Sequence, residues 1–256
     1  MKYKYAVYTD PGTRKKVNQD SCSVQIAETQ YGQAMLTIVC DGVGGLKSGE
    51  QASATVVKKL TDWFENDFSV LLERKTPLLK IKDVLLEIIS DVSCTLKNYG
   101  QKKGIQLGTT IAMLLVFSDR GLLINVGDSR IYCFRNNTAH KLSHDQTVAQ
   151  REVERGKLSP ENALQDKRSH VLLQCIGASE TVVPDFSVIN IESDDVFLVC
   201  TDGFYRKTND SELVFNIASS MNSSESKMKQ SLMLISDMVK NRGEPDNITA
   251  IMVKAE

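Results

Sequence analysis

Three observations predict an α+β protein with packed antiparallel sheets. Short apolar runs typical of strands dominate the chain, and most are joined by tight turns instead of crossover helices. Helical patterns occur in two separate regions, one early and one late. No low-complexity linker divides the 256 residues, so we expect one domain over residues 1–256. Short turns between strands argue against a parallel, doubly wound sheet.

Strand patterns occur along the whole chain. The first strand ends before the turn Asp10-Pro11-Gly12, and residues 34–40 have the continuous apolar run of a fully buried strand. Residues 118–121 and the pair Asn136-Asn137 are hairpin signals. The predicted strands cover residues 3–8, 21–26, 34–40, 109–117, 122–126, 131–135, 140–142, 182–191, 196–200 and 248–253.

Helical patterns are strongest after Pro77, where apolar residues recur at three- and four-residue steps. Either Ser48 or Ser53 is expected to cap the first helix. Residues 98–107 are predicted as a loop, and the polar stretch 156–169 as a mobile insert. The predicted helices cover residues 54–64, 78–96, 146–155, 211–219 and 224–239.

The composition is that of an ordinary soluble protein. The net charge is −1, which gives no broad electrostatic footprint for nucleic acid or an acidic membrane. No apolar stretch approaches the roughly 20 residues needed to span a bilayer, and the N-terminal segment is too polar for a signal peptide. Cys40, Cys133 and Cys200 lie in apolar runs and are expected to be reduced core thiols. We therefore expect a cytoplasmic protein, and we take it as a monomer.

Four aspartates each lie beside a short apolar run and next to a glycine or an asparagine. Asp41, Asp128 and Asp202 follow such runs, and Asp246 opens one. One Asp-Gly pair means little, because it is a common turn dipeptide. Four aspartates at strand ends have rigid mounts, however, and could converge in one cleft, where Asp20 would add a fifth carboxylate.

These carboxylates predict a site for hard metal ions. No histidine accompanies them, and the pair His140 and His144 lies in a predicted strand end and loop, so all-oxygen ligation is expected. Such ligation favours magnesium or manganese over zinc. Two such ions about 4 Å apart can share a bridging water that attacks phosphorus, and they neutralise charge on phosphoryl oxygens.

Seven short blocks carry a more specific signal, in an order that spans nearly the whole chain. They cover residues 12–20, 39–45 with 49–50 and 52–53, 108–110, 125–130, 174–177, 198–203 and 246–249. They include Asp41-Gly42-Val43-Gly44-Gly45, Gly127-Asp128-Ser129-Arg130, Thr201-Asp202-Gly203 and Asp246-Asn247-Ile248-Thr249. Together they resemble the bacterial metal-dependent serine/threonine protein phosphatases of type 2C, the PPM family.

The resemblance implies a fold and an activity. The fold would be a central antiparallel β-sandwich flanked by pairs of α-helices, in four layers, as one catalytic domain with a flap at about residues 145–179. The activity would be the hydrolysis of phosphoserine or phosphothreonine in proteins, through a water that bridges two Mn(II) or Mg(II) ions. The substrates would be phosphorylated proteins, among them a bacterial serine/threonine kinase and its targets.

The resemblance also implies the metal ligands. Asp41 would bridge two ions, and Asp202 and Asp246 would complete the protein ligands of the first; these three would act in catalysis through the bound metals. Asp20 and the carbonyl of Gly42 would serve the second ion. Beyond these, Asp128 would help to hold a third, weaker one.

Three positions depart from the family pattern. Where the family places a phosphate-gripping arginine five residues before Asp20, this chain has Lys15, with Arg14 beside it. Lysine offers a point charge instead of a bidentate fork, so either Lys15 or Arg14 is expected to contact the substrate phosphate. Gln19 replaces an acid found in many relatives, which predicts weaker binding of the second ion. Val43 stands where eukaryotic relatives carry a histidine proposed as general acid.

Other interpretations are weaker. Residues 41–48 resemble a phosphate-binding P-loop, but that loop needs glycine where this chain has Asp41 and Leu46. A non-catalytic binding module of the same fold stays open, although such proteins usually lose the metal aspartates that are present here. A phosphatase restricted to anti-sigma-type regulators also stays open, while the blocks 108–110 and 127–130 favour the branch that opposes kinases.

Overall fold

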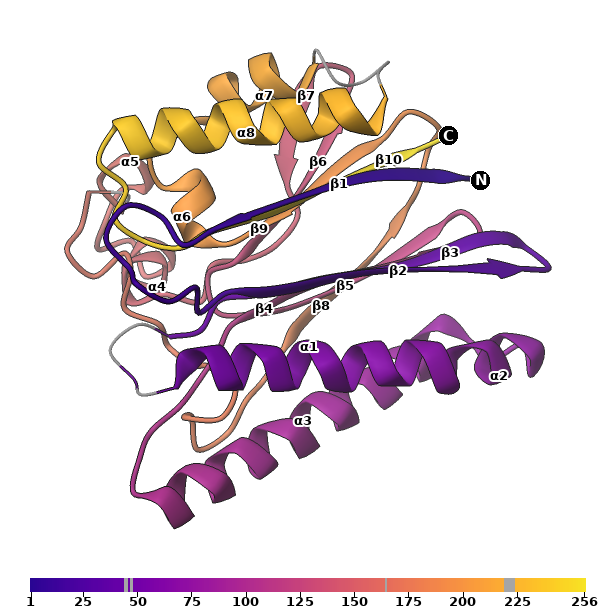
Figure 1. The fold of residues 1–256 in the computed structure, drawn as a ribbon, viewed down its shortest axis with the longest axis horizontal. Helices are drawn as coiled ribbons and strands as arrows, with labels where there is room; N and C mark the ends of the chain where they lie inside the picture. Colours follow the sequence, from indigo (N-terminus) through magenta and orange to yellow (C-terminus); the bar gives the residue numbers. More distant parts are fainter. Residues whose placement is uncertain (44–45, 47, 164, 219–223) are drawn as a thin grey trace.

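Two antiparallel five-stranded sheets pack face to face in the computed structural model, and helices cover both outer sides (Figure 1). The structure describes residues 1–43, 46, 48–163, 165–218 and 224–256. One sheet has the strand order β1-β10-β9-β6-β7, and the other has the order β2-β3-β4-β5-β8. The predicted α+β class, with its antiparallel sandwich in four layers, is confirmed.

Each predicted strand is present, and each pairing between neighbours is antiparallel. Both predicted hairpins form, and the turn at Asn136 and Asn137 places both residues at positive φ, 52° and 57°. The strands are β1 (Tyr3–Asp10), β2 (Ser21–Thr29), β3 (Gly32–Cys40), β4 (Ile111–Phe117), β5 (Arg120–Val126), β6 (Arg130–Arg135), β7 (Thr138–Lys141), β8 (Asp185–Asn190), β9 (Val196–Cys200) and β10 (Ile248–Ala255).

The helices depart from prediction mainly at their ends. The prediction of a loop from residue 98 is wrong as far as Lys103, because the helix continues there and stops at Gly104, whose φ of 64° is left-handed. Three short helices, α2, α5 and α6, were not predicted, because fewer than two turns show no periodicity; α5 lies in the stretch 156–169 that was predicted as a mobile insert. The helices are α1 (Gly49–Asn66), α2 (Phe68–Glu73), α3 (Leu78–Lys103), α4 (Val148–Glu154), α5 (Pro160–Ala163), α6 (Asp202–Tyr205), α7 (Asp210–Ala218) and α8 (Glu225–Asn241).

The expected cap of α1 is only partly correct. Ser48 occupies the N-cap position, but its side chain makes no capping hydrogen bond. Ser53 lies inside the helix, and its hydroxyl donates to the carbonyl of Gln19 at 2.6 Å, which ties the helix to the loop before β2. Gly44, Gly45 and Lys47, which belong to the sequence motifs around Asp41, lie outside the described residues, as does residue 219 of the predicted helix 211–219.

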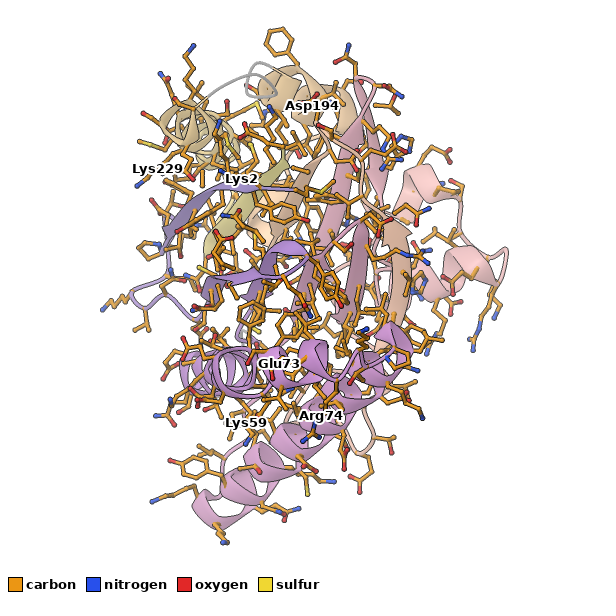
Figure 2. The ribbon with its side chains drawn as sticks, turned by 90° about the vertical axis from the view of Figure 1, so that its right-hand side faces the viewer. Lys2, Lys59, Glu73, Arg74, Asp194 and Lys229 are labelled. Atoms are coloured by element: carbon orange, nitrogen blue, oxygen red, sulfur yellow. The ribbon has the colours of Figure 1, made fainter. Side chains whose placement is uncertain are left out.

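Three apolar layers hold the sheets and helices together. In β3, alternate residues face opposite ways: Leu36 and Ile38 pack under α1 and α3, whereas Met35 and Val39 pack against the other sheet. This double coverage explains the continuous apolar run of β3. Helices α7 and α8 cover the second sheet. Figure 2 shows the same layers from the end near the chain termini, with Lys229 of α8 and Lys59 of α1 on opposite outer sides.

Within the described ranges, no helix is both long and apolar enough to cross a membrane.

Candidate metal centre

The five predicted aspartates lie at one end of the sandwich. Asp20 directly precedes β2 and Asp41 directly follows β3, and the pairing of Ser21 with Cys40 puts them side by side. In the other sheet, Asp202 follows β9 and Asp246 lies just before the adjacent strand β10. Asp128 sits in the turn from β5 to β6, which joins the two sheets at that same end.

Asp41 is at the electrostatic centre of this group. Burial raises the pKa of its carboxyl well above the usual value, and the charges of Asp202, Asp20, Asp128 and Asp246 raise it further, in that order. Thr110 holds the backbone in place, because its hydroxyl accepts from the Asp41 N–H at 3.0 Å and its own N–H donates to the Asp41 carbonyl at 2.9 Å. In the described part of the chain, no hydrogen bond reaches the Asp41 carboxylate, so its lone pairs are available to a metal.

Asp20 is buried with half of its carboxylate unsatisfied. Its Oδ2 accepts from the hydroxyl of Thr201 at 3.0 Å, whereas its Oδ1 has no hydrogen-bond partner among the described residues. Burial, followed by the charges of Asp202 and Asp246, raises the pKa of Asp20 to about 7. A buried carboxylate oxygen without a donor is costly unless a cation binds it.

Asp202 and Asp128 share one arginine that sequence reasoning missed. The Nη2 of Arg206 lies 2.5 Å from Oδ2 of Asp202 and 3.1 Å from Oδ2 of Asp128. The other oxygen of Asp202, Oδ1, is buried and has no partner in the described structure. Burial and the charge of Asp202 raise the pKa of Asp128 to about 7, although Arg206 acts in the opposite direction. The i,i+4 spacing of Asp202 and Arg206 was a signal that could have found this pair.

Lys15 reaches the site, and Arg14 does not. The ammonium nitrogen of Lys15 lies 3.1 Å from Oδ1 of Asp246. Arg14 is exposed, and no ion pair connects it to the described carboxylates. The structure therefore places a positive charge beside the aspartates at residue 15, one of the two positions that sequence left open.

Backbone and amide groups fix the loops that carry these ligands. The side-chain amide of Asn247 ties the loop between β1 and β2 to the segment before β10: its Oδ1 accepts from Gln19 N–H at 2.9 Å, and its Nδ2 donates to the carbonyls of Pro11 at 2.9 Å and Val17 at 3.2 Å. Gly42 has no room for a side chain, since a Cβ there would lie 2.6 Å from the Gln19 carbonyl oxygen. The Gln19 side chain turns towards Glu50, at 3.4 Å.

The donor set fits a hard divalent ion. Five aspartates and the buried Glu244 gather here, and burial, together with the charge of Asp202, raises the pKa of Glu244 as well. In the described structure, no three side chains of the ligand types His, Cys, Asp and Glu close around a single point. Lys15 and Arg206 each hold carboxylates of this group in ion pairs. The unpartnered oxygens of Asp20 and Asp202 are the ones free to coordinate.

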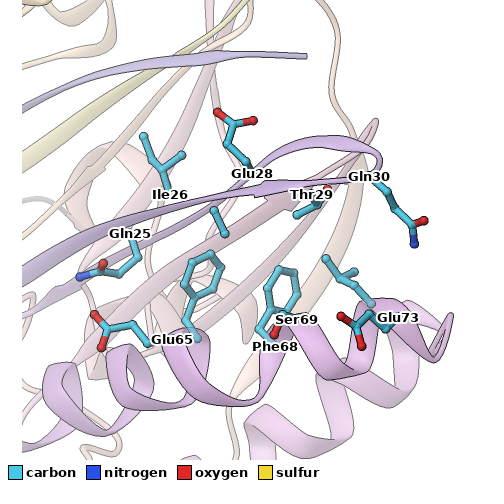
Figure 3. Close-up of a pocket in the computed structure, with 12 residues that line it drawn as sticks. Gln25, Ile26, Glu28, Thr29, Gln30, Glu65, Phe68, Ser69 and Glu73 are labelled. Carbon is cyan, nitrogen blue, oxygen red and sulfur yellow. The ribbon is translucent and has the colours of Figure 1, made fainter.

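One cleft formed by the described residues adjoins this group through Arg206 and Glu244. It has a volume of about 580 Å³, opens between α6 and the segment after Asp145, and has Arg206 and Glu244 in its wall. A groove of about 500 Å³ between β2 and the helices α1 and α2, shown in Figure 3, is lined instead by residues such as Phe68 and Glu73. The cleft beside Arg206 is therefore the candidate substrate site.

Comparisons with known proteins agree with this geometry. The chain is 28% identical over 249 residues to the serine/threonine phosphatase stp of Listeria welshimeri, covering 96% of this chain and 93% of that protein. The solved serine/threonine phosphatase of S. agalactiae matches with a TM-score of 0.85 and 29% identity over 100% of both chains. The catalytic domain of the phosphatase PstP, solved with 2 manganese ions, shares the fold at a TM-score of 0.76 and 22% identity, covering 99% of each chain.

A family model adds to these matches. The model described as protein phosphatase 2C matches residues 12–237, which include four of the five aspartates and most of both sheets. The family predicted from the seven sequence blocks is confirmed: the chain belongs to the protein phosphatase 2C family.

Proposed function

We propose that this chain is a divalent-metal-dependent serine/threonine protein phosphatase that uses two manganese or magnesium ions. The convergence of five carboxylates, with buried oxygens that no donor satisfies, carries the proposal. Family membership makes the chain a phosphoprotein phosphatase that depends on divalent metal. Two bound ions would supply an activated water and would neutralise charge on the phosphoryl oxygens.

The proposed ligand roles follow the placement of the carboxylates. Asp41 would bridge the two ions, and the influence of all four other aspartates on its pKa supports this role. Asp202 and Asp246 would complete the first ion's protein ligands, with Asp20 and the Gly42 carbonyl on the second. In the reaction, a P–O bond to water forms, the P–O bond to serine or threonine breaks, and the alcohol leaves with a proton.

Lys15 is the proposed phosphate ligand. Its ammonium group now pairs with Asp246 at 3.1 Å, and both side chains are about one-third exposed, at 33% and 30%. An ion on Asp246 would take over the neutralisation of that carboxylate, which would leave Lys15 free to donate to a phosphoryl oxygen. Arg14, the alternative, points into solvent in the present arrangement.

The segment 145–179 is proposed as a flap that influences substrate choice. It borders the cleft of about 580 Å³ opposite α6. Asp145 anchors its start through two hydrogen bonds from Arg130, at 2.9 and 2.6 Å, and the Gln146 side chain accepts from the Gly127 N–H at 2.8 Å. Exchanging the segment for that of another phosphatase should change relative turnover among phosphopeptides, and unchanged preferences would contradict the role.

A phosphothreonine peptide assay tests the proposed activity. With manganese present, phosphate release is expected; with a chelator it should stop, and it should return when manganese is restored. Turnover that ignores the chelator would contradict the metal roles, and no turnover under any condition would favour a non-catalytic binding module.

We also propose that the protein acts as a cytoplasmic monomer on a serine/threonine kinase and its targets. Relatives named as serine/threonine phosphatases support the phosphoprotein substrates. Sedimentation of the purified chain should give the mass of one copy. Loss of the chain from cells should raise threonine phosphorylation of a kinase. A stable dimer, or unchanged phosphorylation, would contradict the respective part.

A further inference from the structure

Arg206 holds two of the proposed metal ligands at once. A single nitrogen, Nη2, lies 2.5 Å from Asp202 and 3.1 Å from Asp128. Both carboxylates are almost inaccessible, with side-chain exposures of 8% and 5%, whereas Arg206 retains 26%. A cation at hydrogen-bond distance from two buried carboxylates occupies the place that an ion bridging the same two oxygens would need.

The local fold fixes this arrangement. Helix α6 begins at Asp202 and contains a single turn, so the residue at i+4 returns to the same side of the chain. The Arg206 N–H donates to the Asp202 carbonyl at 2.9 Å. Tyr205, the preceding residue, donates its hydroxyl to the Asp128 carbonyl at 2.8 Å. Tyr205, the last residue of α6, and Arg206, its C-cap residue, therefore tie the Asp128 turn to the Asp202 turn.

The two oxygens of Asp202 have different surroundings. Its Oδ2 contacts Arg206, but its Oδ1 is buried without a partner among the described residues. Asp202 can thus offer Oδ1 to an ion shared with Asp41 while Oδ2 keeps the arginine. At Asp128, the same Nη2 donates to Oδ2 at 3.1 Å, so one guanidinium nitrogen neutralises an oxygen of each carboxylate.

We propose that Arg206 replaces the outer ion, so that this chain binds two divalent ions and Asp128 is neutralised by a guanidinium instead of by metal. The inference rests on the proposed metal-dependent function. Metal–oxygen distances of about 2.0–2.6 Å would put a divalent ion that bridges Oδ2 of Asp128 and Oδ2 of Asp202 within a few ångströms of Nη2, and the like charges would repel strongly. The family resemblance implies that Asp128 is a metal ligand; in this chain, its carboxylate would instead be neutralised by the ion pair with Arg206.

Counting bound manganese tests the inference without using activity. Calorimetric titration of the chelator-treated protein gives the number of ions per chain, for the wild type and for Arg206→Gln, Asp128→Asn and the double variant. Arg206→Gln should bind one more ion than the wild type, and adding Asp128→Asn should remove that ion. Asp128→Asn alone should leave the wild-type number unchanged, because no ion resides there.

Lys207→Gln is the matched control, because Lys207 is the exposed neighbour and contacts none of the aspartates through an ion pair in the described structure. It should bind as many ions as the wild type. An unchanged ion count in Arg206→Gln, or an ion lost in Asp128→Asn, would overturn the inference. The second outcome is informative even where Arg206→Gln does not fold. Failure of the proposed function has a different signature: the wild type would bind no manganese at all.

Discussion

Strands β6 and β9 carry an arginine–aspartate cluster at each end, and the two clusters differ in how completely they are satisfied. At the end near Asp194 (Figure 2), Arg135 donates to both oxygens of Asp195, at 2.7 and 2.6 Å, and the Glu192 N–H donates to one of them at 2.8 Å. At the opposite end, Arg206 contacts one oxygen of Asp202, and the other has no partner in the described structure.

This difference distinguishes a purely structural ion pair, the scaffold cluster of Arg135 and Asp195, from the candidate metal site at the other end. Asp195 is 1% exposed and saturated with donors, so it needs nothing beyond the chain itself. Asp20 and Asp128 at the other end are also buried, and burial together with the charges of neighbouring aspartates raises the pKa of each to about 7. An external cation would satisfy the oxygens that are unpaired in the described structure, as the proposed function requires.

The largest expected effect is loss of activity in Asp202→Asn. An amide gives a metal ion a weaker and uncharged ligand, so kcat should fall about 100- to 1,000-fold. The measurement is phosphate release from a phosphothreonine peptide with manganese, alongside a circular dichroism spectrum that should not change. Asp194→Asn at the scaffold end is the control and should keep full activity. A fully active Asp202→Asn would show that the metal assignment is wrong.

The scaffold cluster should affect stability instead of activity. Arg135→Ala leaves Asp195 buried without its partner, which should lower the free energy of unfolding by about 2 kcal/mol, allowing for the partial exposure of Arg135. Urea denaturation measures it, and kcat of the folded protein should stay the same. Lys58→Ala, which removes an exposed pair with Asp62 at 3.1 Å, should cost only about 0.5 kcal/mol or less. A fall in kcat for Arg135→Ala would break the distinction between the two ends.

Lys15 offers a finer test of the site. If its ammonium group contacts the phosphate, Lys15→Ala should raise KM about tenfold, since a hydrogen bond between charged groups is lost. Arg14→Ala should leave KM unchanged, because Arg14 is exposed and outside the ion-pair network of the described residues. Lys15→Arg should restore most of the affinity. If KM rises in neither alanine variant, neither side chain grips phosphate.

The smallest expected effect concerns the partly exposed His144 and its two acidic neighbours, which lie outside both clusters. His144 lies between Glu154 and Asp185, the latter at 3.3 Å. Partial burial lowers its pKa, but hydrogen bonds and charge from Glu154 and Asp185 outweigh this and raise the pKa above 6.5. Since protonated His144 is favoured in the folded state, its contribution is complete below pH 6.5 and is lost as pH rises through the higher folded value.

His144→Gln measures that contribution. The quantity to compare is the difference in unfolding free energy between the wild type and the variant. This difference should be about 0.5 kcal/mol larger at pH 6 than at pH 9, a small value because all three groups are about half exposed. An equal difference at both pH values would show that the histidine has no charged role.

Sequence was sufficient for the strands and for the position of the aspartates. The apolar runs that end at Cys40 and Cys200 are buried on both faces, and the rigid end of each strand places the following carboxylate. The antiparallel order then brings together residues far apart in the chain. Local patterns carry this information because burial and strand pairing both act over a few residues.

Two parts of the site required three-dimensional contacts. Arg206 caps a helix of one turn, too short to show a period, and its pairing with Asp128 joins that helix to the distant turn between β5 and β6. The choice between Arg14 and Lys15 depends on the path of an irregular loop, in which neighbouring side chains point in unrelated directions. Neither propensity nor spacing determines such a path.

The pairing of β1 with β10 has a consequence for how the protein is made. Tyr3 lies opposite Ala255, and Figure 1 shows the two chain ends side by side. Asn247, which fixes the loop before Asp20, precedes β10. During translation, the first strand must wait until residues 248–255 emerge from the ribosome before it can pair. A nascent chain stalled before residue 246 should therefore bind no manganese tightly, and enzymatic competence should appear only after β10 has been made.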